Sequence, residues 1–261
     1  MNIKQYISRI RRGFNYIYSS ILIYIHEKVY VNTEVSSDRR IKYIITPPIC
    51  HSSRSLVVVF PACAKKAKYN YMRTLKDVDC WRIFIKDDFG ADRKGNYLVE
   101  TETEKLVIKL LEEIIQKHQF EHLFFVGSSK GGYEAINFSL HFPDVNVVVG
   151  APQYYLADYL LSCDSIDSLN DIIGKDHNPE ILANLNNRLK QKILSSVIPP
   201  KRIYLHYSSM EHTYNEHIKD MIEDIKQRGI ALCEDVETYP NHGDLINYFP
   251  KYLKETIVSA L

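Results

Sequence analysis

The segment Val126–Gly132 combines residue types and spacing that could carry acyl-transfer chemistry, because it contains a G-x-S-x-G motif at Gly127, Ser129 and Gly131. The motif stands between an apolar run that predicts a strand and a segment that predicts a helix. Small residues on both sides of the serine allow the tight turn of a nucleophile elbow. We therefore predict Ser129 as the nucleophile. A phosphate-binding turn is the alternative, but the chain lacks a P-loop motif and lacks G-x-G-x-x-G at this turn.

A serine nucleophile needs a histidine base and a carboxylate that orients it, and the hydrolase order along the chain is serine, acid, histidine. His242 lies in a turn-rich loop after the last predicted strand and before the last predicted helix, where this fold places its base. The acid is expected in the loop after the penultimate strand, where Glu211 is the predicted residue. Glu216 and Asp220 are the alternatives, within the following helical segment.

An oxyanion hole is predicted from backbone amides near the nucleophile. One donor is the N–H of Lys130, and the other belongs to the loop after the strand Ser55–Phe60. Pro61 has no N–H, so the second donor is Ala62 or Cys63. For the Lys130 side chain, two interpretations remain open: it holds an anionic donor or acceptor, or it is an exposed lysine at a helix start.

The elements that must position these residues follow a βα alternation. Runs such as Leu56–Phe60 and Leu123–Val126 are continuously apolar, which is typical of parallel strands buried on both faces. Helical segments such as Thr101–Gln119 and Tyr214–Arg228 separate the strands. With the elbow, this pattern predicts an α/β-hydrolase fold: a mostly parallel sheet covered by helices on both faces.

The predicted organisation is an extension at residues 1–40, formed by helix, strands or both, and an α/β-hydrolase domain at 41–261. Within this domain the stretch at about 156–196 is polar and helical without a strand. We expect it to form a small helical cap inserted over one end of the sheet.

Composition narrows the class of protein and its location. The 33 basic and 32 acidic residues nearly balance, which argues against nucleic-acid binding. The 5 cysteines show neither C-x-x-C nor zinc-ligand spacing, so no metal site is predicted and a reducing cytoplasm fits.

The apolar run Ile21–Ile25 is too short to span a bilayer. The basic amphipathic start packs on the domain in the favoured interpretation; in the alternative it lies on the inner membrane surface.

The chain resembles the capsular polysaccharide O-acetyltransferases of the meningococcal serogroup A type. It is similar, more loosely, to a proposed acetyltransferase of the accessory secretion system that exports serine-rich glycoproteins. The likeness runs from about Ser55 to the C-terminus and leaves out residues 1–40. It is carried by Lys68-Tyr69-Asn70-Tyr71, Gly127-Ser128-Ser129-Lys130-Gly131-Gly132, Ala151-Pro152-Gln153 and Leu156-Ala157-Asp158-Tyr159.

The resemblance implies an α/β-hydrolase fold used for O-acetyl transfer. Acetyl-CoA would acetylate Ser129 as a co-substrate, with no permanently bound cofactor, and a polysaccharide hydroxyl would accept the acetyl group. The family's acid falls at Glu211 and its histidine at His242. The acid position departs from the family pattern, because the capsule enzyme type has Asp-Asp where this chain has Glu211-His212. The resemblance also suggests contact with a membrane-associated capsule-assembly complex.

From the residues alone, the prediction reaches only a serine hydrolase fold. A carboxylesterase or deacetylase with the same triad is one alternative. A non-catalytic partner in polysaccharide or glycoprotein export is another, and its hallmark would be a broken triad. The sequence shows no CoA-binding fingerprint and leaves the acceptor sugar and the oligomeric state open.

Overall fold

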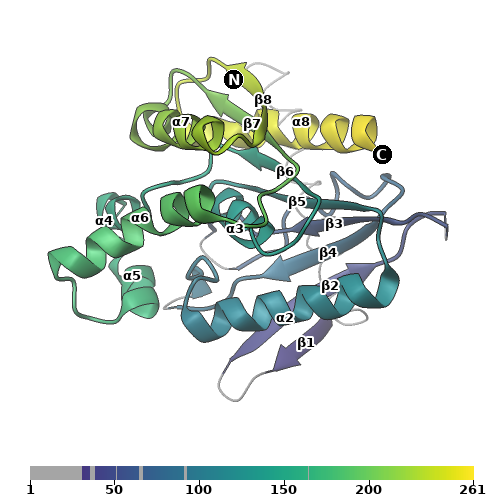
Figure 1. The fold of residues 1–261 in the computed structure, drawn as a ribbon, viewed down its shortest axis with the longest axis horizontal. Helices are drawn as coiled ribbons and strands as arrows, with labels where there is room; N and C mark the ends of the chain where they lie inside the picture. The colour runs from purple at the N-terminus through teal and green to yellow at the C-terminus, as the bar shows by residue number, and fades with distance from the viewer. Residues whose placement is uncertain (1–30, 36–38, 51, 65–66, 91–92, 164) are drawn as a thin grey trace, which may run out of the picture.

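The computed structural model describes residues 31–35 and 39–261, apart from 51, 65–66, 91–92 and 164. These residues form an eight-stranded sheet in the order β1-β2-β4-β3-β5-β6-β7-β8 (Figure 1). The strands are β1 (Val31–Val35), β2 (Arg40–Thr46), β3 (Ser55–Val59), β4 (Trp81–Lys86), β5 (His122–Ser128), β6 (Val145–Gly150), β7 (Arg202–Ser208) and β8 (Ala231–Glu237).

The sheet is parallel from β4 to β8, whereas β1 pairs antiparallel with β2 and β2 antiparallel with β4. The expected α/β-hydrolase fold with a mostly parallel sheet is therefore confirmed. β1 falls within the stretch predicted as an extension, and β2 begins one residue before the predicted domain start at residue 41. The predictions for residues 1–30 lie outside the described residues.

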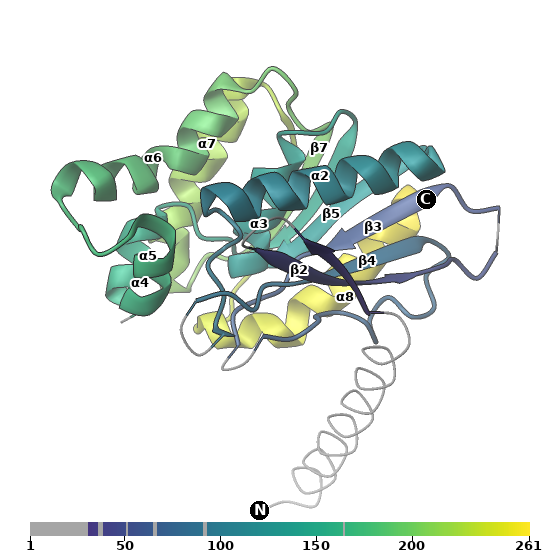
Figure 2. The ribbon, with the colours of Figure 1, turned by 90° about the horizontal axis from the view of Figure 1, so that it is seen from below.

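The helices and helical turns follow the strands in the expected alternation. They are α2 (Thr101–His118), α3 (Lys130–Ser139), α4 (Leu156–Ser162), α5 (Ile166–Ile173), α6 (Pro179–Ser195), the π-helical turn η2 (Tyr214–Ile218), α7 (Lys219–Arg228), the 3-10 turn η3 (His242–Asp244) and α8 (Leu245–Ala260). Helices α4, α5 and α6 lie together at one end of the sheet, between β6 and β7 in the chain (Figures 1 and 2).

Two apolar cores cover the two faces of the sheet. Side chains of a strand alternate between faces, so Val58 joins the core under α2, α3, α6 and α7, while Val57 joins the core under α8. Figure 2 shows α2 and α8 on opposite sides of the sheet. Helices thus cover both faces, as expected. Within the described residues, no helix is long and apolar enough to cross a membrane.

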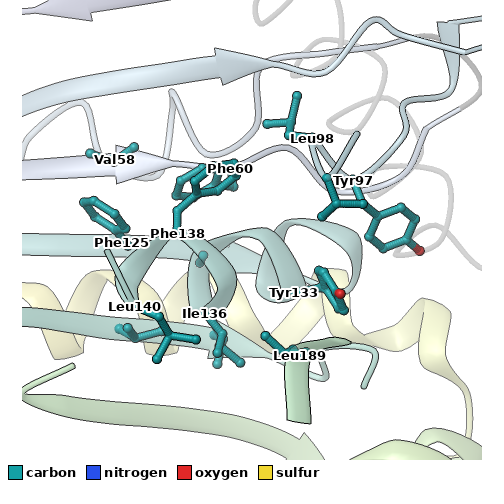
Figure 3. Packing of buried hydrophobic residues seen from close by; sticks show 14 of the residues in the cluster. Val58, Phe60, Tyr97, Leu98, Phe125, Tyr133, Ile136, Phe138, Leu140 and Leu189 are labelled. Atoms are coloured by element: carbon teal, nitrogen blue, oxygen red, sulfur yellow. The ribbon is translucent and has the colours of Figure 1, made fainter. Parts of the chain in front are cut away.

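Aromatic packing fixes α3 against the end of β3. Phe60 stacks on Phe138 of α3 with ring centroids 5.3 Å apart, and it meets Phe125 of β5 edge-on at 5.7 Å (Figure 3). All three side chains are fully buried. The start of α3 and the loop after β3, which the site needs together, are therefore held by one core.

Candidate active site

Ser129 lies in a sharp turn between β5 and α3. Its backbone has φ 53° and ψ −120°, a strained conformation of the kind that a nucleophile elbow requires, and its N–H donates to the Gly150 carbonyl at 2.7 Å. A Cβ on Gly127 would stand 2.2 Å from the Gly131 carbonyl oxygen, and one on Gly131 would stand 2.5 Å from the Phe60 carbonyl oxygen. Both motif glycines are thus sterically required.

The structure brings Ser129, His242 and Glu211 together. His242 Nε2 lies 2.9 Å from Ser129 Oγ, and His242 Nδ1 lies 2.9 Å from Glu211 Oε2. Glu211 is buried and also accepts a hydrogen bond from Thr213 Oγ1 at 2.7 Å, which fixes its carboxylate. With the Nδ1 proton donated to Glu211, the lone pair of Nε2 is free to accept the Ser129 hydroxyl proton.

The alternative acids lie elsewhere. Glu216 is exposed and accepts from His212 Nδ1 at 2.8 Å, and Asp220 accepts from the Tyr155 hydroxyl at 2.6 Å. His212, at the position where the capsule enzyme type has its second aspartate, is exposed too. The carboxylate that contacts His242 is Glu211.

Two side chains that the sequence did not single out as site residues also approach the nucleophile. Gln153 is fully buried after β6, and its Nε2 donates to Ser129 Oγ at 2.8 Å. Tyr159 of α4 also makes a hydrogen bond with the Ser129 side chain. Burial raises the pKa of Tyr159 to about 12, and this hydrogen bond lowers the pKa in part. Both belong to segments that carry the family resemblance, which is the signal that could have found them.

The Lys130 side chain contradicts both of its predicted interpretations. It is 2 % exposed, and its Nζ contacts Asp87 Oδ2 at 2.5 Å and Glu134 Oε1 at 2.8 Å. Burial alone would lower the pKa of Lys130, but the two carboxyl groups raise it above its usual value. Lys130 is therefore a buried cation that neutralises a carboxylate under the elbow, where it reaches neither solvent nor an anionic substrate.

The predicted oxyanion donors belong to the start of α3 and to the loop after β3. Lys130 is the first residue of α3, where amides have no acceptor within the helix. In the loop after β3, the Ala62 N–H donates to Asn70 Oδ1 at 3.2 Å, whereas Cys63 is exposed. The choice of Ala62 or Cys63 as second donor stays a prediction. In the described part of the chain, no cluster of His, Cys, Asp and Glu side chains could hold a metal ion.

The elbow after β5, with the acid after β7 and the histidine after β8, defines an α/β-hydrolase fold. No protein-family model and no curated protein matches the chain. Among solved structures, it is similar to the capsule O-acetyltransferase of Neisseria meningitidis serogroup A, with a TM-score of 0.70, 20 % identity and coverage of 83 % of this chain and 90 % of that one. A histidine variant of the same enzyme, in complex with CoA, gives a TM-score of 0.72 at 18 % identity, covering 87 % and 94 % of the two chains.

The chain is similar to further proteins of this fold. A chain of the glycosylation-associated protein complex from Streptococcus agalactiae has a TM-score of 0.73 at 14 % identity, covering 88 % of this chain and 46 % of that one. An acetyl ester-xyloside bifunctional hydrolase from Caldicellulosiruptor lactoaceticus has a TM-score of 0.59 at 13 % identity, covering 86 % and 89 %. The resemblance expected from the sequence is confirmed at the level of the fold.

Proposed function

We propose that this protein is an O-acetyltransferase that moves an acetyl group from acetyl-CoA to a hydroxyl of a capsular or other cell-surface polysaccharide through an acyl-serine intermediate. The observation that carries the proposal is the unbroken contact chain from Ser129 Oγ through His242 to Glu211, with both contacts at 2.9 Å. CoA bound to the Neisseria meningitidis variant supports the choice of donor. Acetyl-CoA also suits the predicted cytoplasmic location.

In the first half-reaction, His242 Nε2 takes the Ser129 hydroxyl proton while Oγ attacks the thioester carbonyl. The negative oxygen that forms is held by the Lys130 N–H and by the N–H of Ala62 or Cys63. The intermediate collapses by breaking the carbon–sulfur bond, and the leaving thiolate takes the proton from His242. Glu211 stabilises the imidazolium between these two proton transfers.

In the second half-reaction, an acceptor hydroxyl replaces CoA and gives its proton to His242 Nε2. Its oxygen attacks the acetyl carbonyl, and the Ser129 oxygen leaves and regains the proton. Transfer instead of hydrolysis requires that water be kept from the acetyl-serine. The proposed cover is the helical segment at about 156–196, whose Tyr159 reaches the Ser129 side chain.

A carboxylesterase or deacetylase is the competing function. Its triad would be the same, with water in place of the acceptor hydroxyl in the second half-reaction. The likeness to the Caldicellulosiruptor lactoaceticus acetyl ester hydrolase supports this alternative. A non-catalytic role in a glycosylation complex is supported by the likeness to the Streptococcus agalactiae complex, but the assembled triad speaks against it.

The test is CoA release from acetyl-CoA by the purified full-length chain, followed with a thiol reagent, with and without candidate polysaccharides. Ser129→Ala removes the proposed nucleophile. Ser128→Ala is the matched control, because Ser128 Oγ bonds to the Tyr71 hydroxyl instead of the histidine. Glycan-dependent release that is lost only in Ser129→Ala, with an acetyl group on the intact wild-type protein by mass spectrometry, supports the proposal. Equal release without glycan favours the esterase, and no acylation at all favours the non-catalytic role.

A further inference from the structure

Gln153 is a buried polar side chain that contacts the nucleophile and has no part in the mechanism given above. Its Nε2 donates to Ser129 Oγ at 2.8 Å, and the residue is fully buried. His242 Nε2 lies 2.9 Å from the same oxygen. The Ser129 hydroxyl has a single proton, which it donates to His242, so the contact with Gln153 must be made by a donor. The amide nitrogen of Gln153 is such a donor, and its carbonyl oxygen is not.

The turn after β6 aims Gln153 at the nucleophile through a strained backbone. Ala151 has φ 38°, in the left-handed region that residues with a side chain rarely adopt, and its N–H donates to the His206 carbonyl at 2.8 Å. Pro152 packs on α3, where a Cβ added to Gly132 would stand 2.9 Å from the Pro152 Cβ. The chain that leads to Gln153 is thus held by β7 and α3, and strain of this kind clusters at functional sites.

The buried amide of Gln153 is poorly suited to stabilise the fold. Within the described residues, its Oε1 is buried and has no hydrogen-bond partner. A buried acceptor without a partner costs free energy on folding, and an apolar side chain of the same size would avoid that cost. The strained turn and the unpaired oxygen therefore indicate a residue that serves the chemistry of Ser129 and not the packing of the core.

Negative charge develops on Ser129 Oγ when the acetyl group arrives and again when it leaves. In the acetyl-enzyme, Oγ is an ester oxygen, which is a weak hydrogen-bond acceptor. When the bond from the acetyl carbon to Oγ breaks, its electron pair stays on Oγ. A donor to this oxygen bonds more strongly in the transition state than in the ground state, so it accelerates the step. The predicted oxyanion donors serve the carbonyl oxygen instead.

We propose that Gln153 is a further catalytic residue, whose Nε2–H stabilises Ser129 Oγ both as the nucleophile and as the leaving group. In the second half-reaction the acceptor oxygen bonds to the acetyl carbon, and the bond from that carbon to Oγ breaks. The proton that His242 took from the acceptor passes to Oγ, and the Gln153 amide keeps its own protons. The proposal rests on Ser129 as the nucleophile of the proposed function, and it holds for a polysaccharide or a water acceptor.

Two substitutions separate the donor from the space that the side chain fills. Gln153→Met has nearly the same length and removes both the donor and the unpaired acceptor. We expect it to slow each half-reaction about tenfold, the effect of one hydrogen bond to an oxygen that becomes charged, without lowering the free energy of unfolding. Gln153→Glu keeps the shape but puts a carboxylate beside Oγ, so above neutral pH it should be slower than Gln153→Met. Its rate relative to wild type should recover as pH falls, because a protonated carboxyl group is again a donor.

Both half-reactions can be measured on the full-length chain. Acylation is followed by stopped flow with p-nitrophenyl acetate. The isolated acetyl-enzyme is then mixed with water or methanol, and loss of the acetyl group is followed by mass spectrometry of the intact protein. Tyr133→Phe is the matched control, because Tyr133 is fully buried in α3 and its hydroxyl has no partner among the described residues. This variant should keep both rates, and its free energy of unfolding should not fall.

Wild-type rates in Gln153→Met would overturn the proposal. Should Gln153→Met lose stability, the pH dependence of Gln153→Glu decides: a rate that stays in constant ratio to wild type overturns the proposal, and a ratio that recovers at low pH supports it. A wild-type protein that forms no acetyl-enzyme from the ester would overturn this proposal and the proposed function together. If the acetyl-enzyme forms but passes its acetyl group only to water, the transferase function fails, while slower acylation and hydrolysis in Gln153→Met still support the role of Gln153.

Discussion

Under the elbow, the buried cluster of Lys130, Asp87 and Glu134 allows a sharp prediction about stability. One cation and two carboxyl groups cannot all be charged in an apolar interior without a large desolvation penalty. Asp87 accepts hydrogen bonds from the Asn96 and Tyr97 backbone amides at 3.1 and 3.0 Å. Burial raises the pKa of Glu134 well above its usual value; the Lys130 charge acts in the opposite direction, and the adjacent Asp87 carboxylate raises the pKa further. We infer that Glu134 is the member of this cluster that keeps its proton near neutral pH.

Glu134→Gln should therefore raise stability at neutral pH, and Lys130→Met should lower it. The folded state keeps the Glu134 proton while the unfolded state loses it above about pH 4.5, so wild-type stability contains a contribution that falls as pH rises. That contribution changes by about 1 kcal/mol per pH unit until the folded pKa is reached. Glutamine abolishes it. Lys130→Met leaves Asp87 buried without its cationic partner, which should cost about 3–5 kcal/mol out of a typical free energy of unfolding of about 5–15 kcal/mol.

Urea unfolding of the full-length chain, followed by circular dichroism from pH 5 to pH 8, measures both effects. The free energy of unfolding of Glu134→Gln should exceed that of wild type by an amount that grows with pH. The double variant Lys130→Met/Asp87→Asn should recover part of the loss seen in Lys130→Met. A Glu134→Gln protein that is less stable than wild type at every pH, or a gap that shrinks as pH rises, would refute the assigned charges.

Three further substitutions test the site itself. Glu211→Gln should reduce the rate of acylation on the order of a thousandfold or more, because the amide no longer holds His242 in the required tautomer; stopped-flow acylation by an activated acetyl ester measures it. Gln153→Leu should reduce the same rate about tenfold, by removing a donor to Ser129 Oγ, while unfolding stability changes little; an unchanged rate would show that this contact is incidental. Gly131→Ala should destabilise the fold by about 1–3 kcal/mol, because the added Cβ would stand 2.5 Å from the Phe60 carbonyl oxygen. Gly243→Ala is the control: no atom lies within 4 Å of a Cβ added there, so its free energy of unfolding should equal that of wild type.

The parts of the site that depend on local sequence and chain order were predictable. The elbow is predicted by a short motif, Gly127, Ser129 and Gly131. The order serine, acid, histidine then restricts the acid and the histidine to the loops after the last two strands. Glu211 and His242 were found in this way, although they are 31 residues apart in the chain and meet only in the fold.

The parts that depend on side-chain direction could not be predicted in the same way. Lys130 is at a helix start, where lysines are usually exposed, and its burial depends on Asp87, which lies 43 residues earlier at the end of β4. Gln153 reaches Ser129 only because β6 runs beside β5. His217 Nδ1 accepts a hydrogen bond from the Tyr155 N–H, 62 residues earlier in the chain and just before α4. No periodicity or motif encodes such contacts.

The nucleophile and the helical segment after β6 are supported by different parts of the fold. Around Ser129, the close approach of Gly131 to the Phe60 carbonyl and the stacking of Phe60 on Phe138 join β3, β5 and α3 into one packed unit. Rigid support of this kind keeps oxyanion donors and nucleophile in register. Helix α4 and the turn η2 instead belong to segments that connect the strands. Substitutions in α4 and η2 should therefore disturb the elbow less than substitutions in β3, β5 or α3.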